Sequence, residues 1–172
     1  MEKILFVSHP KLRQYAQTID KVTEKEIFIS KKMIETMYAA PGIGLAAIQV
    51  GVAKRIIVLD IAPKDSPRNP MYFINPEIVQ RSENHVTYEE GCLSVPGQFA
   101  EIDRPEKCHI KYLDYQGEKK EIKAEGMLAT CIQHEIDHLE GILFIDYLSK
   151  LKRSMITKKL SKQKRELERI VV

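Results

Sequence analysis

Hydrophobic positions recur along this chain with two periods, one typical of helices and one of strands. Within residues 23–40, the apolar side chains that share one helical face are Ile27, Ile34, Met37 and Tyr38. Thr23 precedes this stretch and Glu26 lies three positions later, which is the spacing of a capping box. The pattern predicts a helix over residues 23–40 that stops at the turn sequence PGIG.

The middle of the chain favours strands. Residues 53–61 and 71–79 are short runs rich in β-branched and aromatic side chains, and a loop dense in Pro, Asp and Ser separates them. Residues 108–126 read as a hairpin that turns at Gln116 and Gly117. Helical spacing returns over residues 127–141 and again over about residues 148–170. A helix, several strands and two further helices predict an α+β fold, not alternating βαβ units.

Length and charge narrow the class of protein. A chain of 172 residues with 44% hydrophobic and 30% charged side chains is typical of one globular domain, which we place at residues 1–172. The net charge of +3 is unevenly distributed, because residues 149–172 contain nine basic and two acidic side chains. The predicted last helix is therefore basic, and its candidate inner face consists of Leu151, Met155, Ile156 and Leu160.

Cysteine usage and hydropathy bear on the compartment. Three cysteines without a signal peptide argue against a disulfide framework. No apolar run approaches the roughly 20 residues of a membrane helix. We therefore expect a cytoplasmic protein with no membrane partner, and the small net charge gives no reason to expect sequence-specific nucleic acid binding.

Residues 133–141, QHEIDHLEG, carry the candidate chemistry. His134 and His138 are four positions apart and so lie on one face of a helix, where both imidazoles can bind one metal ion. Glu135 lies at the edge of that face, where it can act on a water molecule bound to the metal. The alternative is a charged helix face in which the pattern arose by chance. Apolar spacing around the motif favours burial, and buried imidazoles need partners.

A catalytic site of this kind needs a third protein ligand. Cys131 shares the helix face, but it lies about 7.5 Å along the axis from the midpoint of the two histidines, too far for a metal–sulfur bond. Cys108 falls within a strand pattern and reads as a core thiol. Cys92, in the Gly- and Pro-punctuated stretch EEGCLSVPG, is either a ligand or a free buried cysteine.

Three motifs together resemble the signature motifs of peptide deformylase: GIGLAAIQVG at 42–51, EGCLS at 90–94 and QHEIDHLEG at 133–141. The resemblance spans nearly the whole chain, and no catalytic position departs from the pattern. It implies antiparallel sheets packed around a central helix that carries HEIDH, with an N-terminal helix and a basic C-terminal helix. It also implies an enzyme that removes the formyl group from the N-terminal formylmethionine of new proteins and releases formate.

The resemblance assigns roles to matching residues. It implies Cys92, His134 and His138 as metal ligands and Glu135 as general acid and base. Gln49 and the backbone N–H of Leu93 would stabilise the oxyanion, although Gln49 is otherwise readable as a surface residue. The residues implied in substrate binding are Ile43, Gly44, Met127, Thr130 and Cys131. Glu90 and Arg104 form either an ion pair that orients the cysteine segment or a simple surface pair, and Asp137 has a similar supporting role.

The same resemblance points to one divalent ion, with Fe2+ expected and Zn2+, Ni2+ or Co2+ accepted by the same ligands. The expected partners are formylmethionyl nascent peptides and, through the basic last helix, the ribosome. Two rival hypotheses remain. A zinc endopeptidase would cleave internal peptide bonds, but no further ligand motif follows HEIDH. A non-catalytic metal-stabilised module would need four protein ligands.

Overall fold

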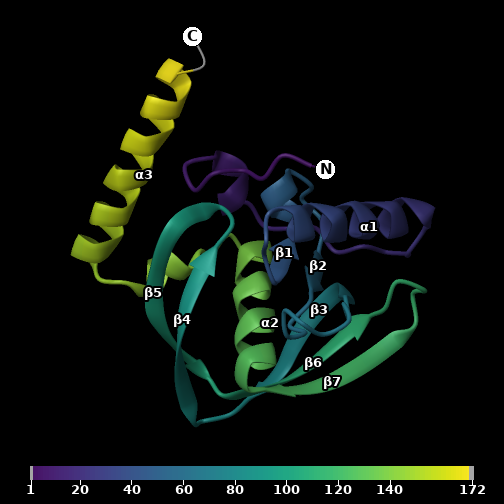
Figure 1. Ribbon diagram of the computed structural model, residues 1–172. Helices are drawn as coiled ribbons and strands as arrows, with labels where there is room; N and C mark the ends of the chain where they lie inside the picture. Colours follow the sequence, from purple (N-terminus) through teal and green to yellow (C-terminus); the bar gives the residue numbers. More distant parts are fainter. Residues whose placement is uncertain (1, 171–172) are drawn as a thin grey trace.

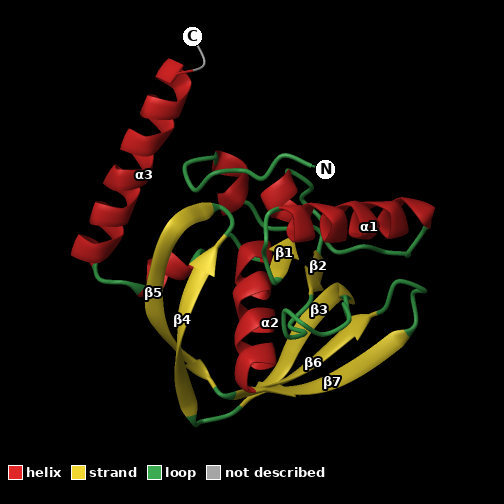
Figure 2. Ribbon diagram, in the orientation of Figure 1, coloured by secondary structure: helices red, strands yellow, loops and turns green. Residues whose placement is uncertain are grey.

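The computed structural model describes residues 2–170, including the side chains of residues 2–166. Figures 1 and 2 show an α+β arrangement in which one helix, α2, lies between a five-stranded sheet and a two-stranded ribbon, and this confirms the predicted fold class. The helices are α1 (Glu24–Ala39), α2 (Gly126–Leu139) and α3 (Lys150–Ile170). The strands are β1 (Gly44–Ala46), β2 (Ile56–Leu59), β3 (Met71–Arg81), β4 (His85–Cys92), β5 (Val95–Pro105), β6 (Lys107–Leu113) and β7 (Lys119–Glu125). Three short 3-10 helices complete the described elements: η1 (Pro10–Arg13), η2 (Ala47–Val50) and η3 (Phe144–Tyr147).

Helix α1 begins at the predicted capping box. The Thr23 side chain accepts a hydrogen bond from the backbone N–H of Lys25, and the Glu26 carboxylate accepts one from the backbone N–H of Thr23. These contacts satisfy backbone donors that have no partner within the helix. The buried face of α1 presents Met33, Ile34 and Met37 to the five-stranded sheet.

The five-stranded sheet has the order β1-β2-β3-β6-β7, and every pair is antiparallel. Strand β2 is buried throughout because its alternate side chains enter different cores. Ile56 and Val58 pack with α1, whereas Ile57 and Leu59 pack with α2. Strand β1 pairs only with β2, so it forms one edge of this sheet.

The two-stranded ribbon of β4 and β5 was not predicted. It is antiparallel, with Glu90 opposite Ala100 and Gly91 opposite Phe99, and its register shifts just before Cys92. Figure 1 shows the ribbon curving along the side of α2 that faces away from the larger sheet. This placement brings the end of β4, and with it Cys92, to the C-terminal half of α2.

Helix α3 extends away from the rest of the protein (Figure 1). Only part of its expected inner face is buried: Leu160 is 4% exposed and Ile156 is partly buried. Leu151 and Met155 are 71% and 62% exposed, so the expectation that they face inward is wrong. Within residues 2–170, no helix is long and apolar enough to cross a membrane.

Candidate metal centre

Cys92, His134 and His138 converge on one point. Their ligand atoms all lie within 4.8 Å of one another, and Cys92 Sγ is 3.3 Å from His138 Nε2. The two histidines come from successive turns of α2, and the cysteine comes from the end of β4. One thiolate and two imidazoles form a donor set that suits a divalent transition-metal ion and leaves a fourth position for water or substrate.

The other two cysteines lie outside this group. Cys131 and Cys108 are both buried in the core between α2 and the five-stranded sheet. Burial raises the pKa of Cys131 to about 12 and that of Cys108 to about 11, so both remain protonated thiols at neutral pH. The structure therefore agrees with the geometric argument against Cys131 as a ligand.

A buried carboxylate, that of Glu90, binds the ring nitrogen of His134 that does not face the metal position. Its Nδ1 lies 2.8 Å from Glu90 Oε2, and Arg104 binds both oxygens of Glu90 through Nε and Nη2. Burial raises the pKa of Glu90, but the contacts with His134 and Arg104 outweigh it and lower the pKa below its usual value. The carboxylate is ionised, and it directs His134 Nε2 toward the metal position. Because Glu90 and Arg104 are both buried, the surface-pair interpretation is wrong.

Asp137 adds a further contact to Arg104, and Tyr147 adds one that was not predicted from the sequence. Arg104 Nη1 donates to Asp137 Oδ2 over 2.8 Å, and the Tyr147 hydroxyl donates to the same oxygen over 2.8 Å. The Arg104 guanidinium also lies over the Tyr147 ring, 4.9 Å from its centroid. No sequence signal identifies Tyr147, because it lies outside the three motifs and reaches α2 only through the tertiary fold.

Glu135 faces the same space without a hydrogen-bonding partner. Its side chain is 5% exposed, and Oε2 has no partner among the described residues. Burial raises its pKa to about 7, which suits a group that accepts and returns a proton near neutral pH. An unpartnered buried carboxylate is costly unless it has a task or a ligand, so this atom also indicates that a metal, water or substrate completes the site.

Gln49 is oriented by the chain around it. Its Oε1 accepts a hydrogen bond from the backbone N–H of Ala46 over 2.9 Å, so its NH2 group is directed away from β1. Nε2 donates to Ser94 Oγ over 3.0 Å and lies 3.4 Å from Cys92 Sγ. The side chain is buried, so Gln49 is not a surface residue, and Ser94 is a second contact that the sequence reading did not single out.

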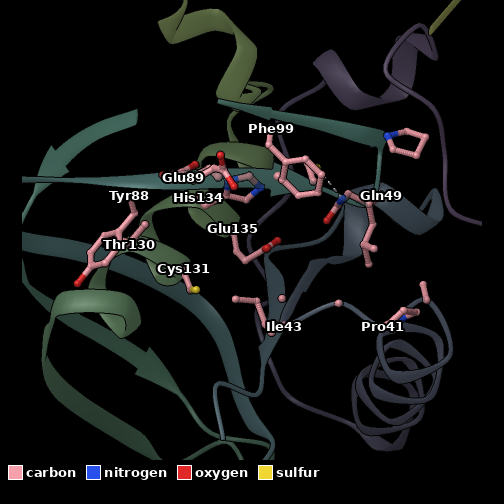
Figure 3. Close-up of a pocket in the computed structure, with 18 of the residues that line it drawn as sticks. Pro41, Ile43, Gln49, Tyr88, Glu89, Phe99, Thr130, Cys131, His134 and Glu135 are labelled. Carbon is pink, nitrogen blue, oxygen red and sulfur yellow. Dashed lines mark hydrogen bonds and ion pairs between the residues drawn. The ribbon is translucent and has the colours of Figure 1, made fainter. Parts of the chain in front are cut away.

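A cavity of about 530 Å³ opens beside Cys92 and His134, a volume within the usual range of small-ligand sites. Figure 3 shows the Glu135 carboxylate and the Gln49 amide directed toward its interior from opposite sides. Its walls include every residue expected in substrate binding, namely Ile43, Gly44, Met127, Thr130 and Cys131, together with Leu93. Tyr88 and Phe99 also line it and were not predicted.

Comparisons of the sequence and of the structure with known proteins point to the same family. The sequence matches the model of the polypeptide deformylase family over residues 1–154. A peptide deformylase of Pelagibacter ubique is 58% identical over 164 residues, which cover 95% of each chain. One of Phenylobacterium zucineum is 54% identical over 162 residues, which cover 94% of this chain and 96% of the relative. A crystal structure of peptide deformylase from Ehrlichia chaffeensis in complex with actinonin superposes with a TM-score of 0.90 at 44% identity, covering 96% of this chain and 98% of that one.

Proposed function

We propose how this chain, which belongs to the peptide deformylase family, carries out the reaction of that family. The resemblance inferred from the three motifs is confirmed. The chain is a metal-dependent hydrolase that removes the formyl group from the N-terminal formylmethionine of new proteins and releases formate. One observation supports the residue roles best: the unpartnered Glu135 carboxylate lies at the same cavity as the Cys92, His134 and His138 ligand set.

The metal ligands are Cys92 Sγ and the Nε2 atoms of His134 and His138 in this proposal. An ion held there supplies Lewis-acid chemistry, which lowers the pKa of a water molecule toward neutrality and polarises the formyl carbonyl. Glu135 accepts the proton of the attacking water. It then delivers that proton to the nitrogen of the departing amine, so one carboxylate serves first as base and then as acid.

The oxyanion that forms at the formyl carbon needs donors already in place. Gln49 Nε2 is one, because its hydrogen bonds to Ser94 and its proximity to Cys92 hold the amide beside the ligand set. The backbone N–H of Leu93 is the other, since Leu93 follows Cys92 directly and lines the cavity. A carboxamide and a peptide N–H donate without titrating, so the stabilisation does not depend on pH.

The substrate peptide binds along the free edge of β1. Gly44 begins this edge strand and lines the cavity, so the substrate backbone can pair with it as an added strand. The methionine side chain then enters the apolar part of the cavity, between Ile43, Met127, Thr130 and Cys131. An unbranched thioether adapts well to such a slot.

Ferrous iron is the ion we propose in the cell, because the family resemblance points to it. The same ligands accept zinc, nickel or cobalt. A ferrous site with a thiolate ligand is sensitive to oxidation of both the iron and Cys92. Metal analysis after anaerobic purification tests the assignment, and activity of the iron form should decay in air faster than that of a nickel-substituted form. Equal decay of both forms would contradict an iron-specific lesion.

Residues 1–172 form one catalytic domain in this proposal, with α3 as a basic extension that docks to the ribosome in the cytoplasm. The charge of residues 149–172 supports this partner, because they contain nine basic and two acidic residues and an RNA surface is anionic. The substrate also supports it, since formylated chains emerge from the ribosome. The alternative is a helix that only packs on the domain through Ile156 and Leu160.

Formate release from a formyl-Met-Ala-Ser peptide by the anaerobic ferrous protein tests the residue roles. Glu135→Gln is the matched variant: it should keep the ion, because Glu135 is not a proposed ligand, and lose roughly a hundredfold to ten-thousandfold in turnover. Turnover by the variant at the wild-type rate would remove Glu135 from the mechanism. Cleavage of internal bonds in an unformylated peptide would instead favour the endopeptidase alternative.

A further inference from the structure

Tyr147, the last residue of the 3-10 helix η3, contacts Asp137 and Arg104 behind the proposed metal site. The Tyr147 hydroxyl donates to Asp137 Oδ2 over 2.8 Å, and the Arg104 guanidinium lies 4.9 Å from the centroid of the Tyr147 ring. Tyr147 is 51% exposed, so these two contacts are not simply imposed by close packing in the core. A half-exposed tyrosine that makes one directed hydrogen bond and one cation–π contact indicates a specific arrangement.

From Tyr147 a continuous set of polar contacts leads to a proposed metal ligand. Arg104 Nη1 donates to Asp137 Oδ2, the atom that also accepts from Tyr147. The other two guanidinium nitrogens of Arg104 bind Glu90, and Glu90 Oε2 contacts His134 Nδ1. Apart from Tyr147, these side chains are largely buried, so each has few alternative partners.

Tyr147 contributes in two ways that a different residue would not combine. Burial and the Asp137 charge raise its pKa to about 12, so the hydroxyl remains a donor at neutral pH. The ring lies beside the Arg104 guanidinium, whose ion pair with Asp137 is largely buried. With Asp137 held, the planar guanidinium is fixed in the orientation that binds both oxygens of Glu90.

We propose that Tyr147 is a positioning residue for His134, acting through Asp137, Arg104 and Glu90. The proposal rests on the ligand assignment made above for His134. A purely packing role for Tyr147 is the alternative, and it predicts lower stability without a change at the metal. Partners that orient a metal-bound histidine directly are worth about 10–100-fold in affinity or activity. Two further side chains, Asp137 and Arg104, lie between Tyr147 and the direct partner Glu90, so we expect a smaller effect of about three- to tenfold.

The test compares Tyr147→Phe with wild type in the cobalt-loaded protein. The variant keeps the ring over Arg104 and loses only the hydroxyl. Cobalt release to an excess of chelator, followed by the thiolate-to-cobalt absorption band, should be about three- to tenfold faster. For the formyl-Met-Ala-Ser peptide, kcat should fall and KM should be unchanged. The unfolding midpoint of the metal-free protein should remain close to that of wild type. Tyr15→Phe is the control, because the Tyr15 side chain is 75% exposed.

A second variant separates positioning from packing. If Tyr147 acts through Asp137, then Tyr147→Phe should add nothing to cobalt release once Asp137 is replaced by Asn. Asp137→Glu replaces Asp137→Asn if the latter yields no soluble protein. Unchanged cobalt release in Tyr147→Phe, or an effect that adds fully to that of the Asp137 variant, would overturn the proposal. The cobalt readout does not depend on deformylation, so failure of this proposal is distinguishable from failure of the proposed function.

Discussion

The Gly44 backbone lies so close to the Glu135 carboxylate that a side chain at position 44 would displace the carboxylate. A methyl group at the Cβ position of Gly44 would overlap Glu135 Oε1 and would lie 2.9 Å from Leu59 Cδ2. The edge strand proposed to pair with the substrate is thus in contact with the proposed general base. Glycine allows the peptide-binding backbone and the proton-transfer group to share one small space.

Gly44→Ala should therefore impair catalysis more than folding. The new methyl group forces the carboxylate to move, and proton transfer by a positioned side chain is worth about a hundredfold to ten-thousandfold. We expect kcat/KM to fall by about a hundredfold or more, with metal content unchanged. Gly42→Ala is the comparison variant for crowding of the cavity, because the three atoms nearest to its methyl group all belong to the Leu93 side chain and none to Glu135. Wild-type turnover by Gly44→Ala would show that Glu135 need not occupy its observed position.

The buried Glu135 should make the metal-free protein less stable as pH rises. Burial raises its pKa to about 7 from an ordinary value of 4.5, so the folded state holds a proton that the unfolded state has released. The stabilising contribution is complete below pH 4.5 and is lost as pH rises through 7. At 1.36 kcal/mol per pKa unit, the difference of about 2.5 between the two pKa values corresponds to a total loss of about 3 kcal/mol, most of which falls between pH 5 and pH 8.

Glu135→Gln removes this titration. Urea unfolding of both metal-free proteins at pH 5 and pH 8 measures it, and we expect the wild type to lose about 2–3 kcal/mol relative to the variant between the two pH values. The comparison cancels the titration of shared groups that lie away from Glu135. His134 is not among them, because burial lowers its pKa and neighbouring groups, the Glu135 charge among them, raise it above its usual value. An equal stability difference at both pH values would mean that Glu135 has an ordinary pKa.

The two cysteines near the site should differ in their effect on metal content. Cys92→Ala leaves two protein ligands, so the purified protein should contain little metal. Cys131→Ala leaves all three ligands and should retain about one ion per chain while altering turnover, because Cys131 lines the cavity. Elemental analysis of the two variants decides the assignment. Metal loss from the Cys131 variant, with retention in the Cys92 variant, would reverse it.

The charge on α3 should affect ribosome binding but not chemistry. We expect a variant with five alanines in α3 to co-sediment with ribosomes at least about tenfold less at low salt, because fewer counterions are released. Its turnover of short peptides should remain within about twofold of wild type. The five replaced residues are Lys158, Lys159, Lys162, Lys164 and Arg165.

The matched control removes the same charge from the β6–β7 hairpin. Its replaced residues are Lys107, Lys111, Lys119, Lys120 and Lys123. Full ribosome binding by the α3 variant would mean that α3 has only a structural role. An equal loss of binding in the hairpin control would mean that the interaction depends on net charge alone.

Local sequence signals predicted those parts of the fold whose structure depends on neighbours in the chain. The capping box at Thr23 and Glu26 marks the start of α1, and Gln116 and Gly117 mark the β6–β7 turn. The ribbon of β4 and β5 escaped prediction because most of its side chains are polar or exposed and its glycines and prolines resemble a loop. The pairing of β4 with β5 depends on tertiary context, as strand formation generally does.

The same distinction applies to the site. His134, Glu135 and His138 were evident because one helix presents them with a fixed spacing. Cys92 and Gln49 required the family resemblance, since nothing in their local sequence indicates that they meet α2. Ser94 and Tyr147 were not found, because a lone hydroxyl has a role only after the fold brings it to a partner. Leu151 was assigned to an inner face because periodicity does not reveal where a helix leaves the body of the protein.

Because the metal centre joins β4 to α2, metal binding should affect the stability of newly made protein. Cys92 and His138 are 46 residues apart in the sequence, and within the described structure the ribbon that carries Cys92 pairs with no strand of the larger sheet. An ion bound by both therefore acts as a cross-link that closes a long loop, and it stabilises the folded state by an amount that rises with the logarithm of its free concentration divided by its Kd. Newly made chains should be most open to proteolysis at the ribbon before metal arrives, so metal supply would set the amount of this enzyme as well as its activity.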